Sequence, residues 1–149
     1  MNTLATTTDR DRSGRASPES PTSTVKNVSE LAGRSLLSAL FLLSGVGKIG
    51  AYATTGAYMS SVGVPSVLLP VVIATEVLGA TAIVLGWQTR VSALLLAGYS
   101  LLAALIFHTN FADQIEMIMF LKNVSIAGGF LLLVANGAGP LSLDRRLAK

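Results

Sequence analysis

The chain has 149 residues, of which 51% are hydrophobic and 13% are charged, and its formal net charge is +3. The charged fraction is about half of the roughly 25% found in soluble domains, which indicates a membrane protein. The lack of cysteine excludes disulfides, iron–sulfur clusters and thiolate zinc sites within the chain. The single histidine excludes an in-chain bis-histidine haem. The sequence has no basic stripe with interleaved aromatic residues, so it gives no indication of nucleic-acid binding.

Residues 1–30 form a polar segment rich in serine, threonine and proline, in which four basic side chains balance four acidic ones. A segment of this composition cannot bury enough apolar surface to offset the entropy lost on ordering. We therefore predict a disordered tail over 1–30, a membrane domain over 31–144 and a short basic tail over 145–149. The predicted fold class is all-α, a four-helix transmembrane bundle.

The first apolar segment runs from Leu31 to Ile49 and carries Arg34 and Lys48 near its ends. Its uncharged centre is only about 20 Å long as a helix, so both side chains must reach toward the membrane surfaces to complete a span. A signal peptide is the alternative, because residues 51–53 resemble a cleavage site. The long polar region before the segment, and the lysine between the segment and the site, argue against cleavage.

Three further apolar segments follow. The second, Val67 to Trp87, begins beside two prolines and is interrupted by Glu76. The third, Val91 to Phe107, follows a short link and is therefore an antiparallel neighbour of the second. The fourth, Ile115 to Gly137, contains Lys122. A lysine in hydrocarbon costs about 3 kcal/mol on insertion scales, so this side chain needs a partner, a water-filled cavity or a route to the interface.

Four spans place both ends of the chain on one side of the membrane. Nearly all the basic residues flank that side, in residues 1–30, at Arg90 and in residues 145–149. The positive-inside rule then predicts cytoplasmic N- and C-termini, with Arg34 and Arg90 as topology anchors. The link over residues 50–66 is the longest connection and is predicted to be an external loop.

Each predicted span places polar residues on the same stripe as small residues, which mark close helix contacts in membranes. The polar side chains are therefore predicted to face the interior of the bundle. The stripes are Ser38, Gly45 and Lys48 in the first span, Glu76, Gly79 and Ala80 in the second, Ala93, Ala97, Ser100, Ala104 and His108 in the third, and Lys122, Ser125 and Gly129 in the fourth.

The depth of these residues along their spans brings the polar side chains of four helices into the outer half of one bundle. The candidate ligand or proton site consists of Lys48, Glu76, His108, Lys122 and Asn123. Opposite charges can stay ionised in a low dielectric when they pair. We predict that Glu76 pairs with Lys122, with Lys48 as the competing partner.

Other polar residues have simpler interpretations. His108, at a helix end, is also typical of an interfacial residue or a cap. Asp113 and Glu116 suit the solvated start of a helix, where acidic side chains favour the dipole, and no metal site is expected there. Asp144 is predicted to lie on the surface. The paired glycines at 128–129 are explained by close helix packing.

Several segments, in order, carry a family resemblance. They are LLSALFLLSGVGKI in the first span, VGVP before the second, LGWQTR after Glu76, a histidine ending the third span, and LKNVSIAGGFLLL followed by GAGPLSLD. Together they resemble the DoxX family of small bacterial membrane proteins over about 31–144. The resemblance implies a four-helix bundle in the bacterial inner membrane. It also implies a link to redox systems, since some relatives are the membrane subunit of a thiosulfate:quinone oxidoreductase and others are tied to oxidative-stress complexes.

The family has no agreed catalytic signature, and three functions fit the residues. In the first, the protein is the membrane subunit or anchor of a redox system and binds a quinone through Lys122, His108 and Glu76, while a soluble or membrane oxidoreductase partner supplies electrons. In the second, it is a non-catalytic bundle that recruits or stabilises a partner, and the polar cluster only fixes helix register. In the third, it is a small proton-coupled carrier, which would require a homo-oligomer.

Overall fold

The computed structural model describes residues 21–148, and the predicted disorder of residues 1–20 lies outside them. Four helices are long and apolar enough to cross a membrane, namely α1 (Pro21–Gly50), α3 (Leu69–Leu85), α4 (Thr89–Phe107) and α5 (Gln114–Asn136). The short helices α2 (Tyr52–Ser61) and α6 (Leu143–Leu147) and the 3-10 turn η1 (Ser66–Leu68) complete the described chain, which contains no strand. The prediction of an all-α fold with four membrane helices is confirmed.

The first helix is longer than predicted. α1 begins at Pro21, so residues 21–30, which were assigned to the polar tail, form its first turns. Proline suits this position because the N–H groups of the first helical residues have no intrahelical acceptor. One turn further on, Lys26 Nζ lies 3.9 Å from Glu30 Oε1, four residues along the helix. The 30 residues of α1 span about 45 Å, against about 30 Å for the hydrocarbon core of a bilayer, so this helix tilts or extends beyond the core.

The predicted external loop contains a helix. α2 lies within it and packs against the bundle, with Met59 buried and the ring of Tyr58 stacked on Phe107 at a centroid distance of 5.7 Å. The loop prediction was wrong over Tyr52–Ser61 because we looked for segments long enough to cross a membrane. This segment is too short to cross, but it has no proline and one face that the bundle can cover.

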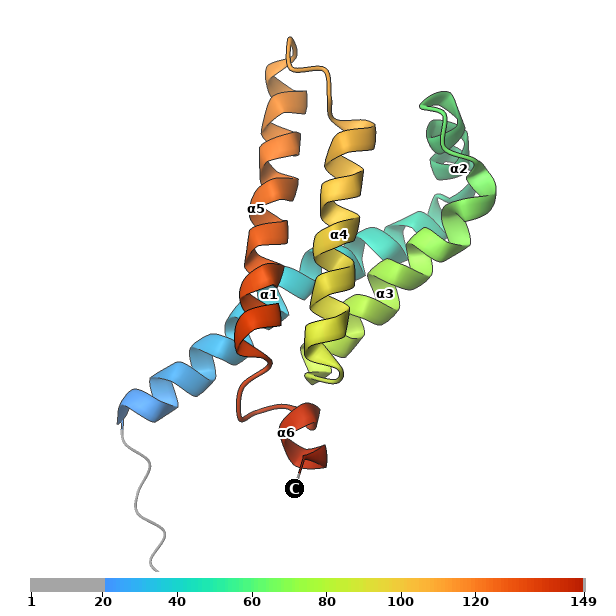
Figure 1. Cartoon of the computed structure of the whole chain (residues 1–149). Helices are drawn as coiled ribbons and strands as arrows, with labels where there is room; N and C mark the ends of the chain where they lie inside the picture. The colour runs from blue at the N-terminus through green and yellow to red at the C-terminus, as the bar shows by residue number, and fades with distance from the viewer. Residues whose placement is uncertain (1–20, 149) are drawn as a thin grey trace, which may run out of the picture.

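Figure 1 shows α4 and α5 as an antiparallel pair, crossed by a second pair formed by α1 and α3. The start of α1 and α6 lie at one end of the molecule, the terminal end, whereas α2 and the α4–α5 connection lie at the opposite end, the loop end. The two pairs meet in a core that includes Phe41, Ile83, Leu96 and Phe130. Outward-facing leucines such as Leu43 are 75% exposed, as expected where a helix faces lipid.

The chain after α5 folds back against the terminal end, and we call residues 137–144 the clasp. Arg34 of α1 is only 2% exposed. Its Nη1 donates to the Ala138 carbonyl at 2.8 Å, and its Nη2 donates to the Leu141 carbonyl. Arg34 was expected to reach toward the membrane surface, but it is buried and ties α1 to the clasp.

Asp144 ends the clasp and caps α4. Its carboxylate accepts the backbone N–H of Gln88 at 2.7 Å and that of Thr89 at 2.9 Å, and its own N–H donates to the Gly86 carbonyl at 2.8 Å. The start of α4 therefore receives its cap from a residue more than fifty positions away. Asp144 is half-buried, and its predicted surface position missed this capping role, because nothing local in the sequence brings the end of the chain to the α3–α4 turn.

Asp144 makes the stability of the terminal end depend on pH. Partial burial raises the pKa of its carboxyl, but hydrogen bonds from Thr89 and Gln88 and the charge of Arg34 outweigh this effect and leave the pKa below its ordinary value of 3.8. Such a group stabilises the fold above its unfolded pKa, and this contribution is lost as the pH falls through the folded pKa.

We therefore expect Asp144→Asn to melt at a lower temperature than the wild type at pH 7, where only the wild type carries the charge. The difference should shrink as the pH drops below about 4, since the wild-type carboxyl then becomes neutral as well. Thermal melting in detergent between pH 7 and pH 3 measures the difference. A difference that stays constant over this range would contradict the assignment.

Candidate functional site: a polar network on an apolar cavity

A cavity of about 960 Å³ lies toward the loop end, and its walls come from all four membrane helices and from α2. Most of the lining is aliphatic or aromatic. All five residues of the predicted cluster line this cavity, although their helices are far apart in sequence. The polar residues on its wall include Ser44, Lys48, Thr55, Glu76, Tyr99, His108, Lys122, Asn123 and Ser125.

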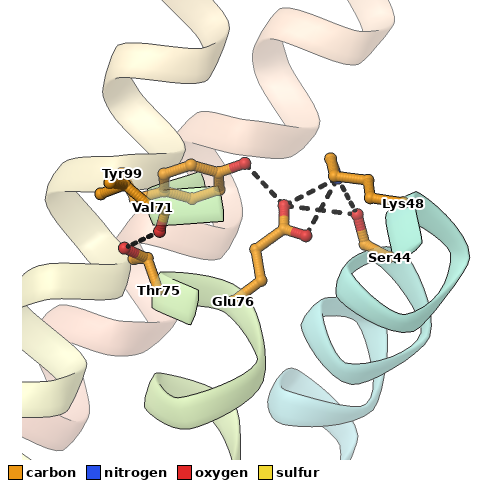
Figure 2. A network of polar contacts seen from close by, with 6 residues as sticks. All are labelled: Ser44, Lys48, Val71, Thr75, Glu76 and Tyr99. Carbon is orange, nitrogen blue, oxygen red and sulfur yellow. Dashed lines mark hydrogen bonds and ion pairs between the residues drawn. The ribbon is translucent and has the colours of Figure 1, made fainter. Parts of the chain in front are cut away.

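Glu76 of α3 is the centre of a hydrogen-bonded network on the cavity wall (Figure 2). Lys48 Nζ of α1 lies 2.9 Å from both carboxylate oxygens. The Tyr99 hydroxyl of α4 donates to Oε1 at 2.6 Å, and the Ser44 hydroxyl donates to the same oxygen at 3.3 Å. Lys48 also donates to Ser44 Oγ at 2.5 Å. Three membrane helices therefore converge on one carboxylate that is 2% exposed.

This network explains how the chain tolerates a glutamate in the middle of a span. A buried carboxylate is costly unless a cation and further donors satisfy its oxygens. Lys48 supplies the opposite charge, and the two hydroxyls supply additional hydrogen bonds. The Tyr99 ring is held edge-on by Phe41, with centroids 6.1 Å apart and planes at 68°. The core thus fixes the direction of the tyrosine hydroxyl.

The predicted pair between Glu76 and Lys122 was wrong. The competing partner, Lys48, forms the ion pair, because α1 packs directly against α3 whereas α5 packs mainly against α4. Lys122 is exposed on the α5 wall of the cavity, as is Ser125, so these two side chains do not face a packed interior. Within residues 21–148, no carboxylate forms an ion pair with Lys122. Its ammonium can therefore meet a molecule that enters the cavity.

The loop end holds a second polar pair. His108 Nδ1 lies 2.8 Å from Glu116 Oε2 and connects the end of α4 to the first turn of α5. Asp113 caps α5 by accepting the Ile115 N–H at 2.7 Å, which fits the predicted helix start. Asn123 donates to the carbonyl of residue 119 within its own helix at 3.0 Å. Among the described residues, no three His, Cys, Asp or Glu side chains are placed to hold a metal ion.

Two residues of the network were not predicted. Ser44 lies one helical turn before Lys48, and its hydroxyl is placed between that lysine and Glu76. Tyr99 interrupts an aliphatic span and precedes Ser100, a member of the predicted small-residue stripe. A phenol within a span usually needs a hydrogen-bond partner, and this was the available signal for Tyr99.

The close approach of α1 and α3 depends on Gly45. A Cβ at this position would lie 2.7 Å from Cγ2 of Val77 and 3.2 Å from Cβ of Glu76. Valine is stiff at χ1, so it cannot turn aside without cost, and the two helices would have to separate. The absence of a side chain at Gly45 therefore sets the distance across which Lys48 meets Glu76.

We expect Gly45→Ala to destabilise the protein by about 1–3 kcal/mol, the usual cost of overpacking a core. Gly47→Ala is the matched control, because a Cβ there has no neighbour within 4 Å and alanine favours the helix by about 0.5–1 kcal/mol. Thermal melting of both variants in the same detergent provides the comparison. Equal melting temperatures would show that the helices do not need this close approach.

The family relationship can now be stated. The family model described as DoxX matches residues 29–109, which hold the whole Glu76 network. The chain belongs to the DoxX family. The inner membrane protein YqjF of Escherichia coli (strain K12) is 47% identical over 125 residues, which cover 84% of this chain and 96% of that protein. The inner membrane protein YphA of the same organism is 45% identical over 114 residues, covering 72% of this chain and 81% of YphA.

No solved structure matches the chain significantly. The family resemblance inferred from the sequence is nevertheless confirmed, and the chain is an integral membrane protein of the DoxX family. The family model ends before α5, so Lys122 and Asn123 lie outside the matched region.

Proposed function

We propose that this DoxX protein is a multi-pass protein of the bacterial inner membrane that binds a quinone in the loop-end cavity and acts as the membrane subunit or anchor of a redox system. The observation that carries the proposal is a largely apolar cavity of about 960 Å³ with an unpaired lysine, Lys122, on one wall and the Glu76 network on another. Both relatives carry the name inner membrane protein, which supports the location.

The residues on the cavity wall suit a quinone. The volume of the cavity is at the upper end of the range for small-molecule sites, about 300–1,000 Å³. The stacked rings of Tyr58 and Phe107 offer a flat apolar surface. The ammonium of Lys122 can donate a hydrogen bond to a carbonyl oxygen. A bound quinone would accept electrons together with protons.

Protons can enter from the loop end. The pair of His108 and Glu116 lies there, and an imidazole beside a carboxylate can accept and pass on a proton. The chain has no cysteine and one histidine, and thus no evident electron carrier of its own, so a soluble or membrane oxidoreductase would supply electrons. The proposal therefore includes a partner protein.

Orientation in the membrane follows from the charges. Arg90, Arg145 and Arg146 all lie at the terminal end, and the positive-inside rule assigns that end to the cytoplasm. The cavity then lies in the periplasmic half of the membrane. A fluorescent protein fused to the C-terminus should fluoresce and an alkaline phosphatase fused there should be inactive; the opposite pair of results would reverse the orientation.

Quinone binding is tested by filling the cavity. Ala103 lines the cavity, whereas Ala74 lies on the exposed side of α3 and does not. Wild-type protein and Ala74→Trp, purified in mild detergent, should yield about one quinone per chain on solvent extraction, and Ala103→Trp should yield little. Melting temperatures confirm that each variant is folded. Equal quinone content in both tryptophan variants, or none in the wild type under conditions that add ubiquinone, would refute the proposal.

A non-catalytic bundle is the second candidate function. It is favoured by the full engagement of Glu76 with Lys48, Tyr99 and Ser44, since a carboxylate whose partners are all within the protein can serve helix register alone. In that case the extraction contains no quinone, and a partner protein is recovered with the wild type and with Ala103→Trp alike. Cross-linking in membranes followed by purification separates the two outcomes.

A further inference from the structure

A second cavity, of about 520 Å³, lies at the terminal end, far from the network around Glu76 in the fold. Its walls are the first turn of α4, the last residue of α5, the clasp and α6. None of its lining residues belongs to the loop-end cavity. It therefore needs an explanation of its own.

Two arginines give this cavity a positive wall. Arg90 and Arg145 both line it and both are exposed. Arg90 makes only a long contact, 3.5 Å from Nη2 to the Ala135 carbonyl, and neither guanidinium forms an ion pair with a carboxylate in the part of the chain that the structure describes.

Within residues 21–148, the acidic residue on the same wall forms no ion pair with either of them. The carboxylate of Asp144 is occupied by the N–H groups of Gln88 and Thr89. The charge of the buried guanidinium of Arg34 also acts on this carboxylate and lowers its pKa. The two arginines at the mouth therefore remain available for an external anion.

The position of the cavity along the bundle identifies the depth at which that anion lies. It opens where α4 begins and α5 ends, and the neighbouring Trp87 is 52% exposed. Tryptophan is enriched at the level of lipid headgroups. An anion bound here sits at the membrane surface, where the phosphates of phospholipids are found.

We propose that this cavity binds a phosphate group, and that the phosphodiester of an anionic phospholipid such as phosphatidylglycerol is its source. Arg90 of α4 and Arg145 of α6 hold the phosphate oxygens. The planar guanidinium fork matches phosphate oxygens in pairs, which a lysine ammonium cannot do. This site is independent of the quinone proposal.

The alternative is that the two arginines only attract anionic lipids by charge and fix topology. The two roles differ in their response to lysine. A topology anchor needs a positive charge, which lysine keeps, whereas a phosphate clamp needs the fork, which lysine loses. Arg146 is the matched control, because it is exposed on the same short helix as Arg145 but does not line the cavity.

The experiment uses the full chain in neutral detergent, with lipid binding followed by native mass spectrometry. Wild type and Arg146→Lys should retain phosphatidylglycerol over phosphatidylcholine. Arg90→Lys and Arg145→Lys keep the charge but lose the second hydrogen bond of the fork, so each should weaken that binding about fivefold, the effect of roughly one hydrogen bond. Millimolar inorganic phosphate is the second arm: displacement of the lipid assigns the site to free phosphate, and no displacement assigns it to the lipid. Equal binding by all three lysine variants, or no preference for phosphatidylglycerol, would overturn the proposal.

Discussion

Lys48→Met is expected to lower the free energy of unfolding by about 3–5 kcal/mol, the usual cost of removing one partner from a buried ion pair. The reason is the position of Glu76, whose buried carboxylate loses both of its contacts with Lys48 Nζ and the opposite charge that they supply. The Tyr99 and Ser44 hydroxyls remain but bring no opposite charge. Thermal melting in detergent and the amount of protein in the membrane both report the loss.

Lys122→Met is the matched control for this result. Both lysines lie within apolar helices and both line the cavity, but only Lys48 is paired. Methionine removes an unpaired charge from α5, so this variant should be at least as stable as the wild type. A loss of stability in Lys122→Met equal to that in Lys48→Met would mean that Glu76 alternates between the two lysines.

A double substitution separates the charge from the contacts. Lys48→Met combined with Glu76→Leu leaves no buried charge, and replacing a buried ion pair by apolar residues is often neutral. We expect the double variant to recover most of the stability lost in Lys48→Met, although the Tyr99 hydroxyl loses its acceptor. A double variant as unstable as the single one would show that the network holds the helices together through more than charge compensation.

The membrane fold could be predicted from the sequence because each span is long and apolar, and because residues that end helices separate it from the next span. The errors fell where length was the wrong criterion. α1 gained ten residues at its start, and α2 formed within a segment too short to cross. Both depend on local helix formation and on contacts with the rest of the bundle, and neither changes the number of spans.

The candidate site was predicted in composition but not in pairing. The helical stripes and depths placed Lys48, Glu76 and Lys122 near one another, and all three line one cavity. Which lysine meets the carboxylate depends on which helices pack face to face. The contact between α1 and α3 rests on the missing side chain at Gly45, a detail of packing that periodicity does not contain.

The terminal end could not be predicted for a different reason. Arg34 and Asp144 are separated by most of the chain, and each has an ordinary interpretation when considered alone, as a topology anchor or a surface acid. Their roles appear only when the clasp folds back, since Arg34 binds two of its carbonyls and Asp144 caps α4. Long-range hydrogen bonds to the backbone leave no periodic pattern in the sequence.

Gly86→Ala is expected to release the clasp from the bundle. Gly86 has a φ of 67°, and a Cβ there would lie 2.4 Å from Cβ and 3.0 Å from Cα of Ser142, and 2.6 Å from Nη1 of Arg34. The left-handed conformation alone costs a non-glycine residue about 1–2 kcal/mol. The clash adds to this cost, because Cα and Cβ of Ser142 are fixed by the backbone of the clasp and cannot rotate away.

Gly63→Ala isolates the contribution of the clash. Gly63 also has a positive φ, 85°, but a Cβ there has no neighbour within 4 Å. Both variants should therefore be destabilised by the left-handed backbone conformation, but only Gly86→Ala should expose the end of the chain. Limited trypsin digestion at Arg145 and Arg146, followed by loss of a C-terminal tag, measures that exposure. Equal cleavage of the two variants would mean that the clasp tolerates the added methyl group.

Arg34→Met provides the complementary test, because it frees the clasp without strain in the α3–α4 turn. It leaves the carbonyls of Ala138 and Leu141 without their donor, and an unsatisfied buried polar group costs about 1–3 kcal/mol. We expect faster tryptic cleavage at the C-terminus, as in Gly86→Ala. The double variant, Arg34→Met with Gly86→Ala, should be cleaved no faster than the single variants, since both changes disrupt the same contact between the clasp and the bundle. Additive cleavage rates would show instead that Arg34 and Gly86 hold the clasp at two independent points.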